Sequence, residues 1–189
     1  MESQYYRTFI GIPMRVDQLF LQARHKLMAA LNEERISWTN SDQYHVTLRF
    51  IGDTELSTVK KIGLALHEGV TIPGQTSLGF AGLASFGPRK RPRVIWVGFE
   101  EAVFFDLLKL EVDRVLESCG IPAVEQPFRA HLTLGRVRSL QNLQKYYEGI
   151  EENNQQFSGP VSVEKLVYFR SILGARGPEY RVLDEILFH

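Results

Sequence analysis

Hydrophobic positions along the chain recur with a period of two, typical of half-buried strands, or of 3.6, typical of amphipathic helices. In "HVTLRF", residues 45–50, Val46, Leu48 and Phe50 occupy one face of an extended strand. The two periods predict strands over 5–12, 45–50, 76–86, 93–99, 131–136, 163–171 and 179–188, and helices over 15–34, 54–69, 101–120 and 139–153. Asp17 is a candidate cap of the first helix.

The predicted elements repeat at a fixed distance. "HVTL" begins at residue 45 and "HLTL" at residue 131, which are 86 positions apart. A shift by 86 places strands on strands and helices on helices, and it also places 93–98 on 179–184. We therefore expect an α+β fold in which residues 1–189 form a single bilobal domain built by internal duplication. Two pseudo-symmetric lobes, each an antiparallel sheet with helices packed outside, would flank a central cleft. The alternative is that regular strand and helix spacing mimics a repeat.

The polar faces of the two repeated strands carry the same pair of residues. His45 and Thr47 share the polar face of the first strand with Arg49, and His131 and Thr133 take the matching places on the second. A single His-x-Thr is common on the solvent face of a sheet. Two of five histidines, each followed by x-Thr-Leu, favour a shared site instead. An approximate twofold axis would bring both pairs to the cleft.

Composition excludes several classes of site. The 189 residues include 22 basic and 22 acidic side chains, a balance that disfavours coating of long polyanions. The single cysteine, Cys119, cannot form an internal disulfide, so we expect a reducing, cytoplasmic location. We expect no membrane contact, because neither a signal peptide nor an apolar stretch of about 20 residues is present. No nucleotide-binding glycine motif or zinc-ligand spacing occurs, so we expect neither a cofactor nor a metal.

Two histidines on opposite sides of a cleft suit a reaction that removes a proton at one end and delivers one at the other. The ordinary histidine pKa lies near 6.5, so one ring can act as base while the other acts as acid. Displacement at phosphorus places the attacking and leaving oxygens roughly in line. Thr47 and Thr133 would donate hydrogen bonds to the non-bridging oxygens. The residue pattern alone leaves open which of His45 and His131 is the acid.

The paired motifs resemble those of the two-histidine phosphoesterases. The segments "RTFIGIP", "HVTLRFIGD", "FGPRKRPRVIWVG", "PFRAHLTLGR" and "YFRSILGARGPEYRVL" are similar to the bacterial and archaeal RNA 2',3'-cyclic phosphodiesterases, formerly called 2'-5' RNA ligases. The resemblance implies a hydrolase of RNA processing in which His45 donates a proton and His131 activates water. Its substrate would be an RNA 3' end or nucleotide bearing a 2',3'-cyclic phosphate, opened to a 2'-phosphomonoester.

Further residues are candidate contacts to substrate. The family carries an arginine that matches Arg136, and this side chain reaches the cleft only if Gly135 twists or bulges its strand. Arg49, where many relatives have a small or apolar residue, either contacts phosphate or is a solvated charge. Phe169 either stacks on the terminal base or packs in the core. The segment "GPRKRPR", residues 87–93, either grips RNA or is an exposed basic turn.

Two other functions stay open at this point. The chain could be a catalytically silent module that binds RNA ends, which a hydrolysis assay with and without EDTA would reveal. It could also be a cyclic phosphodiesterase for small sugar or nucleotide cyclic phosphates, which a comparison of a free nucleotide with an oligonucleotide would reveal. We expect a monomer.

Overall fold

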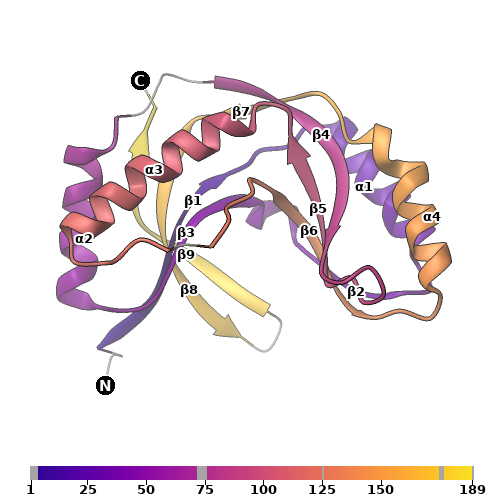
Figure 1. Cartoon of the computed structure of the whole chain (residues 1–189), viewed down its shortest axis with the longest axis horizontal. Coiled ribbons are helices and arrows are strands. Elements are labelled where there is room, and N and C mark those ends of the chain that lie inside the picture. Colours follow the sequence, from indigo (N-terminus) through magenta and orange to yellow (C-terminus); the bar gives the residue numbers. More distant parts are fainter. Residues whose placement is uncertain (1–3, 72–75, 125, 175–176, 189) are drawn as a thin grey trace.

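The computed structural model describes residues 4–71, 76–124, 126–174 and 177–188, which form two sheets with helices on their outer faces (Figure 1). In chain order the elements are β1 (Tyr5–Pro13), α1 (Gln18–Ala30), β2 (Arg35–Trp38), η1 (Ser41–Gln43), β3 (His45–Glu55), α2 (Leu56–Gly69), β4 (Thr76–Phe86), β5 (Val94–Phe99), α3 (Ala102–Ser118), β6 (Leu132–Ser139), α4 (Leu143–Asn153), η2 (Asn154–Gln156), β7 (Pro160–Val163), β8 (Lys165–Gly174) and β9 (Gly177–Leu187).

Both sheets are antiparallel throughout. The first has the strand order β3-β1-β8-β9, and the second has the order β2-β6-β5-β4-β7. Helices α2 and α3 pack together over the first sheet, while α1 and α4 pack together beside the second (Figure 1). The predicted α+β class, with two antiparallel sheets and helices outside them, is confirmed.

Each lobe is assembled from both halves of the chain. Helix α1 follows β1 of the first sheet but packs with α4 at the second, and α3 follows β5 of the second sheet but packs on β3 of the first. Strand β4 likewise joins the second sheet beside β5, and β8 joins the first beside β1. This exchange relates β1 to β5, α1 to α3, β3 to β6, α2 to α4 and β4 to β8, as the shift of 86 residues predicts.

One match of the predicted repeat does not occupy equivalent places. All but the first residue of the segment 93–98 lies in β5, an inner strand, whereas 179–184 lies in β9, the edge strand beyond β8. The short strands β2 and β7, four residues each, were absent from the predicted set because four residues show too little alternation to reveal a strand. The internal duplication itself stays a prediction.

The start of α1 shows how local sequence sets packing in the second lobe. The Asp17 side chain accepts a hydrogen bond from the Phe20 backbone N–H at 2.8 Å, so the predicted cap is confirmed. Such a cap contributes about 1 kcal/mol to stability. It fixes the first turn so that the Phe20 ring packs against Phe80 and Phe157, with centroids 4.7 and 5.1 Å away. Burying a phenylalanine in this way contributes about 1.5–3 kcal/mol.

None of the helices in the described parts of the chain is long and apolar enough to cross a membrane.

Candidate active site

The two repeated histidines are held by the same local contact. His45 is the first residue of β3, and His131 directly precedes β6. The Nδ1 atom of each ring lies 2.7 Å from a backbone carbonyl oxygen two residues earlier, that of Gln43 for His45 and that of Arg129 for His131. A carbonyl oxygen only accepts, so each Nδ1 carries a proton and, in the neutral ring, each Nε2 has a free lone pair. Both rings are therefore fixed with Nε2, the nitrogen available for proton transfer, away from the backbone carbonyl.

Aromatic side chains fix the orientation of each imidazole. The His45 ring lies 5.1 Å from the Phe9 ring and 5.0 Å from the Tyr180 ring, the second edge to face. The His131 ring meets Phe86 edge to face at 4.8 Å. Such packing removes rotamer freedom, so each ring is oriented before a substrate arrives.

The surroundings lower the pKa of both histidines. Burial, which penalises the charged ring, is the main cause in each case. The positive charge of Arg136 further lowers both pKa values, and the charge of His131 also lowers the pKa of His45. The hydrogen bond to the backbone carbonyl opposes these effects at each ring. Both imidazoles therefore favour the neutral form at pH values near 6.5.

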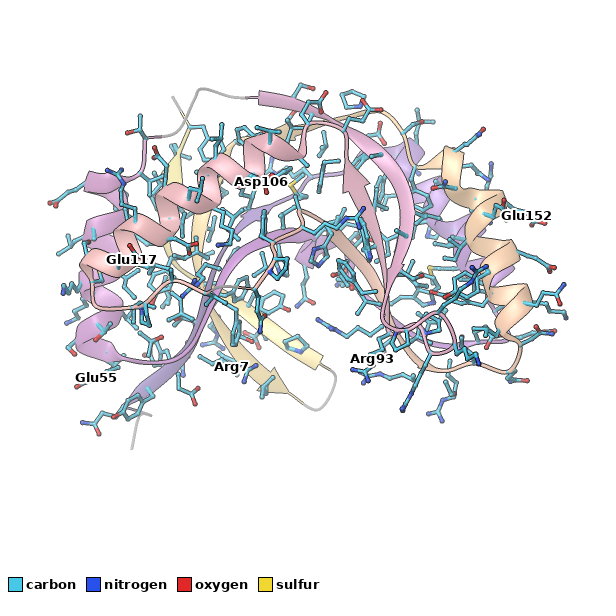
Figure 2. The ribbon with its side chains drawn as sticks, viewed as in Figure 1. Arg7, Glu55, Arg93, Asp106, Glu117 and Glu152 are labelled. Atoms are coloured by element: carbon cyan, nitrogen blue, oxygen red, sulfur yellow. The ribbon has the colours of Figure 1, made fainter. Side chains whose placement is uncertain are left out.

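A cavity of about 780 Å³ between the two sheets brings these groups together. All four residues of the two motifs line it: His45, Thr47, His131 and Thr133. Three arginines, Arg7, Arg136 and Arg138, also line it, and the described residues around it include no carboxylate. Figure 2 labels Arg7 on β1, in the lobe of the first sheet. The site is therefore a cationic cleft that suits a phosphate.

The two threonine hydroxyls are available to a ligand. Neither Thr47 nor Thr133 makes a side-chain hydrogen bond to another described residue, although both line the cavity. A hydroxyl in this situation can donate to an oxygen of a bound phosphate.

A β-bulge follows each His-x-Thr motif. In the pairing of β5 with β6, Trp96 lies opposite Thr133 and Ile95 opposite Gly135, so Leu134 is an extra residue. The bulge turns the side chain of Arg136 to the same face as Thr133, into the cavity. The distortion near Gly135 that the sequence requires for Arg136 to reach the cleft is therefore present.

The first strand has the same bulge, and here strict alternation is wrong. Ile10 lies opposite Arg49 and Gly11 opposite Thr47, so Leu48 is the extra residue. Beyond Leu48, residues that strict alternation would place on one face of the strand lie on the other. Phe50, expected in the core, is 48% exposed and lines the cavity, whereas Arg49 is only 5% exposed.

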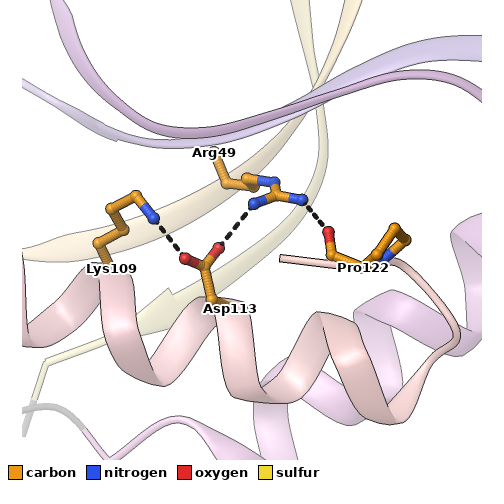
Figure 3. A network of polar contacts seen from close by, with 4 residues as sticks. All are labelled: Arg49, Lys109, Asp113 and Pro122. Atoms are coloured by element: carbon orange, nitrogen blue, oxygen red, sulfur yellow. Dashed lines mark hydrogen bonds and ion pairs between the residues drawn. The ribbon is translucent and has the colours of Figure 1, made fainter. Parts of the chain in front are cut away.

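The prediction that Arg49 shares a face with His45 is thus wrong. At 5% exposure Arg49 is not a solvated charge, and it is not among the residues that line the cavity and could contact substrate. Its guanidinium Nη1 pairs with Asp113 of α3 at 3.1 Å, and its Nη2 donates to the Pro122 carbonyl oxygen (Figure 3). Lys109, one turn earlier on α3, pairs with the same carboxylate. Arg49 therefore ties β3 to α3 and to the segment that leads toward His131.

Phe169, the candidate base-stacking residue, does not line this cavity. Its side chain is 8% exposed and stacks on Phe9 with ring centroids 4.8 Å apart. The burial of this ring favours the second of the two interpretations, core packing. Phe169 supports the site indirectly, because Phe9 in turn contacts His45.

Sequence reasoning missed several residues that line the cavity. Arg7 on β1 and Tyr180 on β9 lie far from both motifs along the chain, whereas Trp38 on β2 is close to His45 in sequence but pairs with β6, in the other sheet. Only the order of strands in the two sheets brings them to the cleft. Arg138 could have been found, because it lies two residues beyond Arg136 on the same face of β6.

In the part of the chain that the structure describes, no three His, Cys, Asp or Glu side chains are grouped so that they could hold a metal ion.

Comparisons with known proteins identify the family. The family model described as "LigT like Phosphoesterase" matches residues 10–96 and 105–180, and each segment contains one His-x-Thr motif. The fold and the paired motifs thus define a phosphoesterase with two histidines in one cleft. The chain belongs to the LigT-like phosphoesterase family.

Individual relatives carry a common name. A protein of Thermotoga maritima named RNA 2',3'-cyclic phosphodiesterase is 30% identical over an alignment that covers 96% of this chain and 95% of the relative. One of the same name from Aeropyrum pernix is 33% identical over 77% of this chain and 82% of the relative.

Solved structures show the same fold at low identity. A crystal structure of a Thermus thermophilus protein superposes with a TM-score of 0.69 at 21% identity, covering 96% of this chain and 97% of that one. Escherichia coli LigT complexed with 3'-AMP superposes with a TM-score of 0.68 at 15% identity, covering 97% and 98%.

Proposed function

We propose that the chain opens the 2',3'-cyclic phosphate at the 3' end of an RNA and leaves a 2'-phosphomonoester, by acid–base catalysis and without a metal ion. The observation that carries the proposal is the pairing of His45 with His131: both rings are anchored through Nδ1 at 2.7 Å and both line one arginine-bearing cavity. The substrate class is that named for relatives at 30–33% identity.

The proposed reaction uses one histidine at each end of an in-line displacement. His131 takes a proton from water through Nε2 as the water oxygen forms a bond to phosphorus. The bond from phosphorus to O3' breaks, and protonated His45 gives its proton to that oxygen. The hydroxyl of the water remains on the phosphate, O3' becomes a hydroxyl, and both rings return to their starting states by exchange with solvent. The assignment of acid and base, and the choice of the O3' bond, rest on the resemblance of the two motifs to the family.

Arginines and threonines would stabilise the charge that develops on the phosphate. Arg136 and Arg138 line the cavity from β6, and Arg7 lines it from β1. Thr47 and Thr133, whose hydroxyls have no partner among the described residues, would donate to non-bridging oxygens. Fixed cations and donors supply the electrostatic stabilisation that a metal ion provides in other phosphoryl-transfer sites.

Product analysis of a defined oligonucleotide tests this proposal. An RNA ending in a 2',3'-cyclic phosphate should be converted to the 2'-phosphomonoester at the same rate with and without EDTA. A 3'-phosphate product would show that the other bond breaks. Activity lost with EDTA and restored by a divalent ion would refute the metal-free mechanism.

The same assay separates the alternative functions. Binding without turnover would indicate a silent RNA-end module, and turnover confined to a free cyclic nucleotide would indicate a small-molecule phosphodiesterase. The cytoplasmic location and the monomeric state stay predictions.

A further inference from the structure

We propose that the basic turn, residues 87–93, binds the phosphodiester backbone of the RNA strand on the 5' side of the cyclic phosphate. This inference rests on the proposed function, and it adds a second contact region outside the catalytic cavity. Such a region would make the chain prefer oligonucleotides over a free cyclic nucleotide.

The basic turn presents its cations on a rigid support. The Arg91 N–H donates to the Pro88 carbonyl, and the Arg93 N–H donates to the Phe86 carbonyl, each at 2.7 Å. Gly87 has φ +109°, and a Cβ there would lie 2.9 Å from the Arg91 carbonyl oxygen, so only glycine fits. A rigid support lowers the entropy lost when a ligand binds.

The cations of the basic turn are exposed and unpaired. Arg89, Lys90, Arg91 and Arg93 are exposed, and none forms an ion pair with a described residue. Some exposed cations elsewhere do have a carboxylate partner, as in the pair of Lys145 with Glu33 at 3.3 Å. In a chain with zero formal charge, four neighbouring cations without partners form a local positive field that attracts a polyanion.

The basic turn is continuous with the catalytic cavity through two contacts. Phe86, the residue before the turn, meets the His131 ring at 4.8 Å. At the other end the Arg93 carbonyl accepts from the Val137 N–H at 2.9 Å, between Arg136 and Arg138, which line the cavity. A strand path from the reactive phosphate to the basic turn would therefore pass Arg136 and Arg138.

The arrangement of charge in the two lobes is consistent with this path. Figure 2 shows Arg93 near the start of β5 and Arg7 on β1, both in the lower part of the view. Among the labelled acidic residues, Glu55 also lies there, at the far left, while Asp106, Glu117 and Glu152 lie above. Two of these acidic residues, Asp106 and Glu117, are on α3, which covers the outer side of the first sheet.

The chemistry of the substrate fixes the direction of the strand. A cyclic phosphate occupies the 3' terminus, so every further nucleotide extends toward the 5' end, and a strand that leaves the cavity along β6 reaches the basic turn with its 5' nucleotides. Contacts to phosphates carry no sequence information and weaken with salt. The basic turn should therefore make the chain prefer longer RNAs without a preference for their sequence.

A length series compares the native chain with a triple variant of the basic turn. The variant carries Arg89→Ser, Lys90→Ser and Arg91→Ser, which keep the backbone hydrogen bonds. The matched control carries Lys26→Ser, Lys60→Ser and Arg114→Ser, which remove the same charge from exposed positions on α1, α2 and α3. Substrates are a cyclic mononucleotide and RNAs of two to eight nucleotides with a 2',3'-cyclic phosphate.

We expect kcat/KM of the native chain to rise with RNA length. The turn variant should lose roughly 10- to 100-fold in kcat/KM on the octamer, mainly through a higher KM. On the mononucleotide its kcat/KM should change less than about twofold. The dependence of log kcat/KM on log salt should flatten by about 2, since each contact to a single strand contributes about 0.7. The control should behave like the native chain. Equal losses on all substrates, or no loss on the octamer, would overturn the proposal.

A binding experiment tests the basic turn independently of the proposed function. An octamer that already ends in a 2'-phosphate is titrated by fluorescence anisotropy against the native chain and both variants. Weaker binding by the turn variant alone supports the inference even if no substrate is hydrolysed, and unchanged binding refutes it. Failure of the native chain to open any cyclic phosphate would refute the proposed function only.

Discussion

The two histidine-bearing strands share one backbone device and differ in the side chains placed on it. In β3 and in β6 the extra residue of the bulge is a leucine, Leu48 or Leu134, directly after the threonine of the motif. Each bulge exchanges the faces of the strand beyond it, so the third residue after the threonine enters the cavity. That residue is Phe50 in β3 and Arg136 in β6.

The residues behind the bulges differ as well. At Gly135 in β6 the neighbouring side chains leave no room for a Cβ, which would lie 2.8 Å from the Ile36 side chain. Arg49 takes the matching place in β3 and makes a buried ion pair with Asp113. A common backbone thus places one aromatic and one cationic side chain around a symmetric pair of imidazoles, and this asymmetry gives the two sides of the cleft different chemistry.

The largest expected effect comes from removing either imidazole. His45→Ala and His131→Ala should each lower kcat/KM on an RNA cyclic phosphate by about 10²- to 10⁴-fold. The losses should not multiply in the double variant, because either change already disables the coupled proton transfers. His25→Ala, at an exposed position of α1, is the matched control. Multiplicative losses would show that the two rings act independently.

The buried ion pair of β3 should matter for stability more than any exposed pair. Asp113→Ala leaves Arg49 and Lys109 without a carboxylate in a site where Arg49 is 5% exposed, and should lower the free energy of unfolding by about 3–5 kcal/mol. Glu33→Ala breaks the exposed pair with Lys145 and should cost less than about 1 kcal/mol. Denaturant unfolding measures both. Equal, small losses would contradict a structural role for Arg49.

The two threonines should contribute similarly despite their different neighbours. Thr47→Val and Thr133→Val should each lower kcat by about 10- to 1000-fold, since a donor to the transition-state oxygens is lost while the volume is kept. Steady-state kinetics on one oligonucleotide check this. A change in KM alone would show that the hydroxyls bind the ground state equally well.

The charge of Arg136 should shift the pH profile rather than abolish activity. The base must be neutral and the acid protonated, so kcat/KM rises through the pKa of His131 and falls through that of His45. Burial and Arg136 lower both pKa values from 6.5, so the maximum should lie below pH 6.5.

Arg136→Gln removes one of the causes that lower both values, so the whole profile should move to higher pH. Arg138→Gln, in the same cavity, is the control and should weaken binding without moving the profile. An unshifted profile in Arg136→Gln would contradict the electrostatic role of that residue.

Much of this site could be predicted from periodicity and repetition, because both report local backbone geometry. The strands that carry His45 and His131, the Asp17 cap and the outer helices all follow from such patterns. Alternation failed after Thr47, since a bulge leaves no mark in the hydrophobic pattern of a single strand. The shift of 86 residues nevertheless maps Phe50 onto Arg136, so the bulge expected near Gly135 could have been expected in β3 too.

The remaining residues of the site could not be predicted from local sequence. Arg7, Trp38 and Tyr180 reach the cavity only through the strand order of the two sheets, which depends on long-range pairing. The exchange of α1 and α3 between the lobes is likewise invisible to periodicity, because a helix with one apolar face can pack on either sheet. Phe169 shows a further limit, since its pattern fits both stacking on a base and packing behind Phe9.

Selective rescue by a better leaving group tests the central claim, a division of labour between the two histidines. The p-nitrophenolate group of a p-nitrophenyl phosphodiester leaves without being protonated. The proton donor therefore becomes dispensable for this substrate, while the base does not. The measurement is the ratio of kcat/KM for this ester to that for an RNA cyclic phosphate, in His45→Ala and His131→Ala. We predict that His45→Ala regains nearly the native rate on the ester and that His131→Ala stays impaired. Rescue of His131→Ala instead would reverse the two roles, and rescue of neither variant would contradict acid–base catalysis by this pair.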